Sequence, residues 1–405
     1  MSNTMATIEK VVKTYPIESA DNIEMTQVLD YHVVTKKGEF KAGDFVIYAR
    51  VDSIFPDGLS EEDKIKHSEL KKIKKEHSDN VDIDNQISEV LSRNTIPEFE
   101  FLRKDKFTIK AKKYSKFRNE LGNKIISEGI IFPTTILKNK QYIIEGKDVT
   151  SLLGITKVVE DEEEIITEEK ENKIKKFLFK YKLFRKLYFI FAPKKISGNW
   201  ESWLPAKSDE ENIQKLFSKI VFNHGRNNYV VTEKLEGRNI SFYKYETKSW
   251  FGKKVNYGVC SRNRHLPKDD GSDFWSAVKD NDFLNKLKNC EGNILVRGEN
   301  CGPKIQGNIY KLTKDKIFIF DVYNIKNQRF YNYQETVEFC NRYGFEMVPV
   351  ISDNFTLPET VLELLEFSNG KSVLYPTMRE GLVIRKKDDY TISFKAKSPE
   401  YLAKK

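Results

Sequence analysis

Hydrophobic and polar positions alternate over residues 6–56, as they do in short β-strands that are buried on one face. The clearest runs are Ile23 to Val34 and Phe45 to Val51, and turn residues lie at Lys37-Gly38 and at Lys41 to Asp44. The same pattern resumes at Lys124 to Leu137 and continues to about Lys157. Short strands joined by such turns predict a small β-barrel over residues 1–157.

Two charged stretches interrupt or follow this barrel. Residues 59–113 are rich in lysine and partly helical in pattern, which fits a solvated helical face and extra contacts to nucleic-acid backbone equally well. Residues 158–195 pass from an acidic cluster into a tract that mixes basic and aromatic residues. Charges interrupt this tract too often for it to span a bilayer. We favour an interdomain linker helix over an amphipathic helix on a membrane surface, because the acidic neighbour would repel anionic lipid.

From about residue 196 the pattern changes to strands mixed with helices. The predicted strands are residues 229–232, 240–245, 255–260, 294–298, 317–322, 382–385 and 391–396, and the predicted helices are residues 273–287, 334–343 and 359–367. Gly344 follows the second of these helices and is a typical helix stop. Antiparallel sheets with flanking helices are expected, so the whole chain belongs to the α+β class.

The composition predicts the kind of binding partner and the cellular compartment. The chain has 405 residues, a formal charge of +9 and a pI near 9.0, which favours an anionic partner, most often nucleic acid. Its four cysteines are too widely spaced for a disulfide framework or a zinc motif. There is no run of spanning length and no secretion signal, so we expect an intracellular, cytoplasmic protein that does not bind membranes.

Lys234 lies in Val230-Val231-Thr232-Glu233-Lys234-Leu235-Glu236-Gly237-Arg238-Asn239-Ile240, where an apolar strand ends in a lysine, an acid and a glycine. An amine can attack phosphorus only when it is partly deprotonated and when the phosphate charge is neutralised, for example by a metal that Glu236 helps to hold. Gly237 would let the backbone approach a nucleotide closely. Taken alone the motif is weak, because a strand that ends in a charged glycine turn is also an ordinary hairpin.

Five further short motifs follow Lys234, each at the edge of a predicted strand. They are Ser261-Arg262-Asn263, Arg297-Gly298-Glu299, Phe320-Asp321-Val322-Tyr323, Glu380-Gly381-Leu382-Val383-Ile384-Arg385 and Phe394-Lys395-Ala396-Lys397. Each alone has a structural explanation: Glu299 and Glu380 as turn carboxylates, Phe320 as a core residue, and the final lysines as a solvated strand face. All six motifs in one order within one domain are improbable by chance.

In this order the motifs resemble those of the covalent nucleotidyltransferase superfamily of nucleic-acid ligases and capping enzymes. The chain is most similar to ATP-dependent RNA ligases of the Deinococcus-type family, which carry a barrel domain before the nucleotidyltransferase domain. The similarity extends to Phe132 to Leu137, Glu145 to Gly154 and Lys207 to Gln214.

The resemblance also implies a domain organisation. It predicts an N-terminal OB-like β-barrel domain at 1–157 with a charged insertion at about 59–113, a charged and aromatic linker at 158–195, and a nucleotidyltransferase (adenylyltransferase) domain at 196–405.

The resemblance implies a role for each motif residue. Lys234 would attack the α-phosphate of ATP and become a lysine-adenylate, and Lys395 and Lys397 would neutralise that phosphate. The implied nucleotide contacts are Glu233 with the adenine amino group, Phe320 stacked on adenine, and Glu299 with the ribose or a metal-bound water. Arg262 would contact the ribose or a 5′-phosphate, and Asn239, directly after Arg238, would also bind the nucleotide. Glu236, Glu299 and Glu380 would surround a hydrated Mg²⁺ or Mn²⁺, which prefers oxygen ligands.

The implied reaction has three steps. Lys234 is adenylated with loss of pyrophosphate, AMP is transferred to a 5′-phosphate end, and a 3′-hydroxyl attacks that end and releases AMP. The expected partner is a nicked duplex whose 3′-hydroxyl strand ends in RNA, because the 2′-hydroxyl distinguishes RNA from DNA. The barrel would grip the duplex through phosphates, and a monomer is expected.

Two alternatives stay open beside the RNA ligase. An ATP-dependent DNA ligase typically has arginine two positions after the motif glycine, whereas this chain has Asn239 there and Arg238, whose role is unassigned, one position earlier. DNA ligases and capping enzymes also place a barrel after the last motif, where only ten residues follow Lys395. A non-catalytic nucleic-acid-binding protein would need a decayed pocket, yet the nucleophile, the carboxylates and both late lysines are present.

Overall fold

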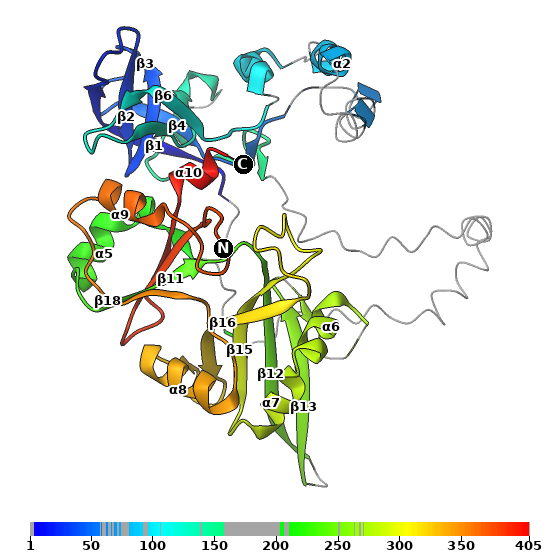
Figure 1. Cartoon of the computed structure of the whole chain (residues 1–405). Helices are drawn as coiled ribbons and strands as arrows, with labels where there is room; N and C mark the ends of the chain where they lie inside the picture. Colours follow the sequence, from blue (N-terminus) through cyan, green and yellow to red (C-terminus); the bar gives the residue numbers. More distant parts are fainter. Residues whose placement is uncertain are drawn as a thin grey trace. The chain divides into compact units, whose positions relative to one another are not determined.

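The computed structural model describes residues 4–157 and 203–404, with gaps at 57, 59–61, 64–65, 67–68, 71–72, 74–80, 92–95, 106, 138–139, 206–209, 250–251, 263, 267–268 and 270. The chain divides into two compact units (Figure 1), Met1–Val158 with Leu402–Lys405, and Val159–Tyr401. The predicted linker at 158–195 lies outside the described residues. None of the helices described is long and apolar enough to cross a membrane.

The first unit is built on a five-stranded antiparallel sheet in the order β3-β2-β1-β4-β8. These strands are β1 (Ala6–Pro16), β2 (Ile23–Val28), β3 (Tyr31–Lys36), β4 (Phe45–Ala49) and β8 (Ile130–Pro133). Two antiparallel pairs accompany the sheet: β5 (Ser53–Ile54) with β9 (Thr156–Lys157), and β6 (Lys112–Arg118) with β7 (Lys124–Ser127). The 3-10 helices of this unit are η1 (Pro97–Asp105), η2 (Thr134–Ile136) and η3 (Lys140–Tyr142).

The predicted run Ile23 to Val34 forms two strands rather than one. Leu29 adopts a left-handed backbone with φ of 54°, and the chain reverses at Leu29-Asp30 between β2 and β3. The sequence did not indicate this turn, because leucine rarely adopts a left-handed backbone and is not a typical turn residue. The alternation of buried positions was therefore visible in the sequence, but the turn was not.

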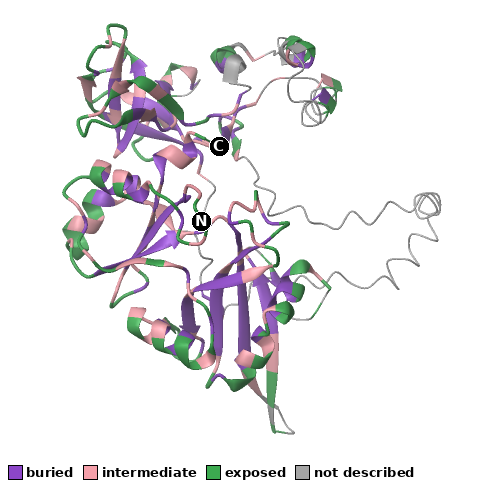
Figure 2. Ribbon diagram, viewed as in Figure 1, coloured by how far each residue is buried: buried purple, intermediate pink, exposed green. Residues whose placement is uncertain are grey.

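Residues of the charged insertion contribute to the core of the first unit. Helix α2 (Val81–Leu91) buries Ile83, Ile87 and Val90 in the same apolar cluster as Ile8 and Phe55. These three side chains have the i, i+4, i+7 spacing of one helical face. The helix therefore packs on one side (Figure 2), and the exposed positions described on it are polar.

The second unit contains two sheets. One has five strands in the order β10-β20-β19-β11-β18, and the other has six in the order β14-β13-β12-β15-β16-β17. The five-stranded sheet comprises β10 (Glu211–Asn212), β11 (Tyr229–Lys234), β18 (Val350–Phe355), β19 (Gly381–Lys386) and β20 (Ser393–Lys397). The six-stranded sheet comprises β12 (Arg238–Ser249), β13 (Gly252–Ser261), β14 (His265–Leu266), β15 (Ile294–Cys301), β16 (Lys316–Asn324) and β17 (Arg329–Phe330).

Helices cover one face of each sheet in the second unit. Helices α6 (Asp273–Asp280), α7 (Phe283–Asn289) and α8 (Tyr333–Tyr343) pack on the six-stranded sheet, where they bury residues such as Val278, Leu287 and Phe339. Helices α5 (Phe217–His224) and α9 (Val361–Ser368) pack on the five-stranded sheet. The short elements η4 (Ile213–Lys215) and α10 (Pro399–Leu402) complete the fold.

The helix predictions are partly confirmed. Helix α8 ends at Gly344, which caps it in the left-handed conformation with φ of 70°, as predicted. The predicted helix 273–287 is wrong as a single element, because Asp282 adopts φ of 58° and separates α6 from α7. Aspartate tolerates this conformation better than most residues, which makes the break possible without a glycine.

The two sheets are tied together next to the ends of β11 and β16. The Ile319 amide donates to the Glu346 carbonyl at 2.7 Å, and the Val348 amide donates to the Ile319 carbonyl at 2.9 Å. One residue further along, the Glu233 amide donates to the Pro349 carbonyl at 2.9 Å. The residues before β18 therefore fix β11 of one sheet against β16 of the other.

Candidate active site

Lys234 is the last residue of β11, and strand register sets what lies beside it. It is paired with Gly381 on β19, and Gly381 is paired with Lys397 on β20. Residues directly opposite in an antiparallel sheet project from the same face. Lys234 and Lys397 therefore share a face, with a glycine between them that contributes no side chain.

Lys395 lies on the same face two residues before Lys397. Strand β20 alternates buried Phe394 and Ala396 with half-buried Lys395 and Lys397. The apolar pair packs in the core beneath α9, so the period of two residues directs both lysines to the opposite side. The structure thus brings the three predicted catalytic lysines to one face of one sheet.

Gly381 is required where it stands. A Cβ at this position would lie 2.3 Å from the Ala396 carbonyl oxygen and 2.8 Å from the Lys397 Cα, and its φ is +156°. A side chain here would push β20 away from β19 and displace Lys397.

Glu380 lies beside Gly381 and contacts the nucleophile candidate directly. The Lys234 Nζ donates to the Glu380 Oε2 at 2.8 Å, and the two side chains are 23% and 10% exposed. The Glu380 carbonyl accepts the Ser398 amide at 2.9 Å, which holds the residue against the end of β20. In this structure Glu380 is thus the partner of the lysine that the sequence predicts as the nucleophile.

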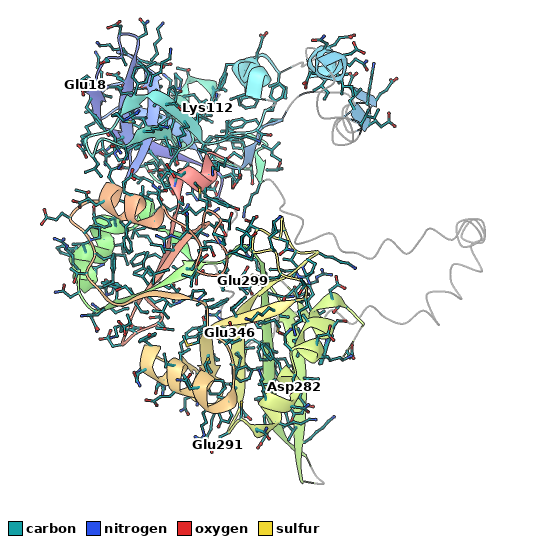
Figure 3. All side chains as sticks on the ribbon, in the orientation of Figure 1. Glu18, Lys112, Asp282, Glu291, Glu299 and Glu346 are labelled. Atoms are coloured by element: carbon teal, nitrogen blue, oxygen red, sulfur yellow. The ribbon has the colours of Figure 1, made fainter. Side chains whose placement is uncertain are left out.

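A second group of predicted residues lies on neighbouring strands of the six-stranded sheet. Asn239 on β12 is paired with Glu299 on β15. Figure 3 labels Glu299. Arg262 follows Ser261, the last residue of β13, which is paired with Ile240. Arg262, Asn239 and Glu299 therefore lie at one level of this sheet.

Phe320 occupies a β-bulge. Arg297 is paired with Asp321 and Gly298 with Ile319, so Phe320 is the extra residue on β16. Bulges re-aim a side chain and are frequent beside active sites. The Phe320 ring is half-buried, with the guanidinium carbons of Arg297 and Arg385 at 5.9 and 5.4 Å from its centroid.

Both of these arginines are held in buried ion pairs. The Arg297 Nε and Nη2 donate to the two carboxylate oxygens of Asp321 at 2.6 Å each. The Arg385 Nη2 donates to the Glu210 Oε1 at 2.7 Å. Burial raises the pKa of Glu210, but Arg385 and the other neighbouring cations outweigh it and leave that pKa below its usual range. Bidentate and charge-assisted bonds of this kind fix the walls around Phe320.

The thiol of Cys301 lies close to several of the predicted carboxylates and to Lys234. Burial raises the pKa of its thiol well above the usual value, and Glu299, Glu233 and Glu236 raise it further, while Lys234 lowers it. Charges act on the pKa of a thiol in this way only at short range. Members of both sheets therefore surround one small region.

Gly237 and Arg238 have structural explanations that differ from the sequence expectation. A Cβ on Gly237 would lie 2.7 Å from the Asn300 carbonyl oxygen and 2.7 Å from the Glu299 Cγ, so the glycine permits a close approach to β15. Arg238 is buried, with its guanidinium carbon 4.3 Å from the Phe274 ring centroid. Its stacking on α6 gives this arginine a packing role.

Several residues of the site were not singled out from the sequence. Tyr310 accepts the Glu236 amide at its hydroxyl oxygen, at 2.7 Å, in a segment without predicted elements. Asp321 and Arg297 were quoted only as members of motifs, although their opposite charges on adjacent strands were a usable signal. The Val373 amide, which donates to Glu233, and Arg379, which donates to the Ser368 carbonyl, lie in a loop whose fold periodicity does not predict.

The described part of the chain has no preassembled metal site. There, no group of three or more His, Cys, Asp or Glu side chains could hold a metal ion.

Comparisons with known proteins agree with this geometry. Residues 227–401 match the family model of RNA ligases, and residues 5–81 match a model of an OB-fold domain. No curated protein matches the chain. The family match and the fold indicate a polynucleotide ligase, and they confirm the predicted α+β class with an N-terminal OB-fold domain.

Solved structures of an RNA ligase from Naegleria gruberi are similar over the whole chain. The ligase with PPi is 24% identical with a TM-score of 0.69, and the alignment covers 100% of this chain and 99% of that one. A mutant with ATP and Mn is 24% identical with a TM-score of 0.68 and the same coverage. A mutant with AMP and Mn is 24% identical with a TM-score of 0.66, again covering 100% and 99%. At this identity the likeness establishes a shared fold.

Proposed function

We propose that the protein is an ATP-dependent RNA ligase of the Deinococcus type, in which Lys234 becomes covalently bonded to AMP. The observation that carries the proposal is the register that aligns Lys234 with Gly381 and Lys397, with Glu380 at 2.8 Å from the Lys234 Nζ. An amine, a carboxylate and two further cations on one face meet the requirements of attack on a phosphate ester.

The chemistry divides one difficult displacement into three steps. The Lys234 Nζ attacks the α-phosphorus of ATP, a P–N bond forms, and pyrophosphate leaves with the broken P–O bond. A 5′-phosphate oxygen of the nucleic acid then displaces the lysine and takes AMP. Finally, a 3′-hydroxyl oxygen attacks that 5′-phosphate, loses its proton, and releases AMP.

The chain's own residues would bind and orient the nucleotide. Lys395 and Lys397 would neutralise the α-phosphate, whose charge grows in the transition state. Phe320 would stack on adenine, with its ring held near Arg297 and Arg385. Further contacts would come from Glu233, Arg262, Asn239 and Glu299.

Mg²⁺ or Mn²⁺ would be held by Glu236, Glu299 and Glu380, through bound waters. The donor set fits, because hard cations of this size prefer carboxylate oxygens and keep several waters, so they do not need three protein ligands at once. Such an ion supplies charge neutralisation at the phosphates. The structures with ATP and Mn of the Naegleria gruberi ligase support this assignment.

The first unit offers a surface for the nucleic acid. The β6–β7 hairpin and the residues just before it carry exposed basic side chains at Lys110, Lys112, Lys113, Lys116, Arg118 and Lys124, and Figure 3 labels Lys112. On the same hairpin Tyr114 and Phe117 pack against the cluster of Ile17, Met25 and Ile125, which anchors the strand. This basic hairpin would bind backbone phosphates beside a nick.

The domain organisation and setting are part of the same proposal. We assign residues 1–157 to the nucleic-acid-binding domain, 158–195 to a linker and 196–405 to the adenylyltransferase domain. The buried free thiols of Cys260, Cys290, Cys301 and Cys340 fit the reducing cytoplasm, and one copy carries every proposed site residue.

Covalent labelling tests the proposal. The protein is incubated with α-labelled ATP and Mg²⁺ and analysed by denaturing electrophoresis, with Lys234→Ala beside it. We expect label on the wild type and none on Lys234→Ala, while Lys254→Ala, an exposed strand lysine of the same unit, keeps full label. An unlabelled wild type would leave the non-catalytic nucleic-acid-binding protein as the better explanation.

The substrate assignment has its own test. Nicked duplexes that differ only in the terminal sugar of the 3′-hydroxyl strand are sealed side by side. We expect faster sealing with ribose, because its 2′-hydroxyl is the group that separates RNA from DNA. Equal rates for ribose and deoxyribose would contradict this preference and favour a DNA ligase.

A further inference from the structure

The carboxylate of Glu233 is half satisfied. Its Oε2 accepts the Val373 amide at 2.8 Å, whereas its Oε1 is buried and has no hydrogen-bond partner among the residues described. The residue itself is 1% exposed. A buried carboxylate oxygen without a donor is unfavourable, so this atom is suited to a ligand that donates a hydrogen bond.

The loop of residues 370–379 presents the donors to Glu233. The loop is closed by a bridge between Lys371 and Met378 and by the Ser372 amide, which donates to the Thr377 carbonyl at 2.8 Å. The Ser372 hydroxyl oxygen accepts the Leu374 amide at 3.1 Å, which fixes the side-chain rotamer. The Val373 side chain is 63% exposed, so only its backbone takes part in this contact.

Arg379 anchors the base of the loop. Its guanidinium donates to the carbonyls of Phe367, Ser368 and Asn369 at 2.6, 2.9 and 2.8 Å, at the end of α9. Gly370 leaves room for this side chain, since a Cβ there would lie 3.2 Å from the Arg379 Cζ. The donors to Glu233 are therefore held by a structured loop.

The charge state of Glu233 decides which base edge it can meet. Burial raises the pKa of this carboxyl above its usual value, and hydrogen bonds from Ser372 and Val373 and the charge of Arg379 offset part of that rise and favour the ionised form. An ionised carboxylate only accepts hydrogen bonds. The exocyclic amine of adenine donates, whereas guanine has the carbonyl O6, an acceptor, at that position.

We propose that Ser372 and the backbone amide of Val373 position the Glu233 carboxylate so that its second oxygen selects adenine over guanine nucleotides. This inference rests on the proposed adenylation of Lys234. It makes the loop of residues 370–379 a determinant of nucleotide choice, although the loop lies in none of the six motifs. Ser372 and Val373 act through Glu233 and are positioning residues.

Removing the amide donor tests the proposal. Val373→Pro has no N–H, and Val373→Ala keeps the N–H while shortening an exposed side chain. Initial rates of covalent labelling with α-labelled ATP and α-labelled GTP are measured for each variant. We expect the ATP to GTP ratio to fall roughly tenfold in Val373→Pro, the order of effect of one charge-assisted hydrogen bond, and to stay unchanged in Val373→Ala.

Ser372 gives an independent test that does not alter the backbone. Ser372→Ala should lower the ATP to GTP ratio, and Ser372→Thr, which keeps a hydroxyl, should restore it. A uniform loss of both labelling rates with an unchanged ratio in Val373→Pro and in Ser372→Ala would overturn the inference, because a purely structural loop would act that way. A wild type that takes up label from neither nucleotide would overturn both this inference and the proposed function.

Discussion

The contact between Lys234 and Glu380 is the most informative pair of side chains in the molecule. The Lys234 Nζ donates to the Glu380 carboxylate at 2.8 Å, and this charge-assisted hydrogen bond holds the amine in place. An amine attacks phosphorus through a free lone pair. In the proposed reaction Lys234 would therefore have to release its hydrogen bond to Glu380 before it attacks.

We expect Glu380→Gln to slow adenylation of Lys234 by at least roughly tenfold, because the amide keeps the shape but removes the negative charge that this residue would offer to Mg²⁺ or Mn²⁺. The rate of label uptake from α-labelled ATP measures this. The matched control is Glu346→Gln, since Glu346 pairs with Lys316 at 2.8 Å outside the proposed site. Similar slowing in both variants would mean that Glu380 has no specific role in adenylation.

At the level of strands, β19 is the element that organises the site, because it brings β11 and β20 into register on its two sides. We expect Gly381→Ala to lower the free energy of unfolding by about 1–3 kcal/mol and to reduce adenylation, since the new Cβ meets the backbone of β20. Urea unfolding followed by tryptophan fluorescence reports on the second unit, where all four tryptophans lie.

The control for this substitution is Gly307→Ala. There the added Cβ would meet only the Ile309 Cγ2 at 3.8 Å, which is an ordinary contact. An unfolding free energy for Gly381→Ala equal to that of Gly307→Ala would show that β20 can adjust without cost.

The sequence allowed most strands of the second unit to be predicted, because buried and polar positions alternate clearly there. The predicted strand 229–232 is found as β11 (Tyr229–Lys234), with its motif residues at the end, where they were expected. Strand β18 (Val350–Phe355) was missed, since its residues are mostly exposed or half-buried and show no clean alternation. Periodicity detects a strand only where one face is buried.

The sequence predicted which residues form the candidate site better than it predicted how they are arranged. Motif order identified Phe320, but the bulge that presents it depends on a shift of register between β15 and β16. The partner of Glu233 is the amide of Val373, 140 residues away, and a backbone donor leaves no trace in residue type. Long-range pairing of this kind is set by tertiary structure.

At the level of the whole molecule, the first unit would bind the nucleic acid and the second would carry out adenylation. If the basic hairpin binds phosphates, Lys116→Ala combined with Lys124→Ala should weaken binding to a nicked duplex and reduce the slope of log affinity against log salt by about one to two. Label uptake from ATP, which needs no nucleic acid, should stay at the wild-type rate.

Lys254→Ala provides the control for binding, because this exposed lysine lies in the second unit. A salt slope identical in the double variant and the wild type would remove the hairpin from the proposed interface.

The absence of a side chain at Gly381 has an electrostatic consequence. Neighbouring strands are about 4.8 Å apart, so the backbones of Lys234 and Lys397 stand roughly 10 Å from each other with nothing but glycine between them. The ammonium groups of Lys234, Lys395 and Lys397 thus lie on one face of the sheet and repel one another, and Glu380 offsets only part of their charge. A polyanion bound across that face would relieve the rest of the repulsion, which would favour binding of a triphosphate chain before any bond is made.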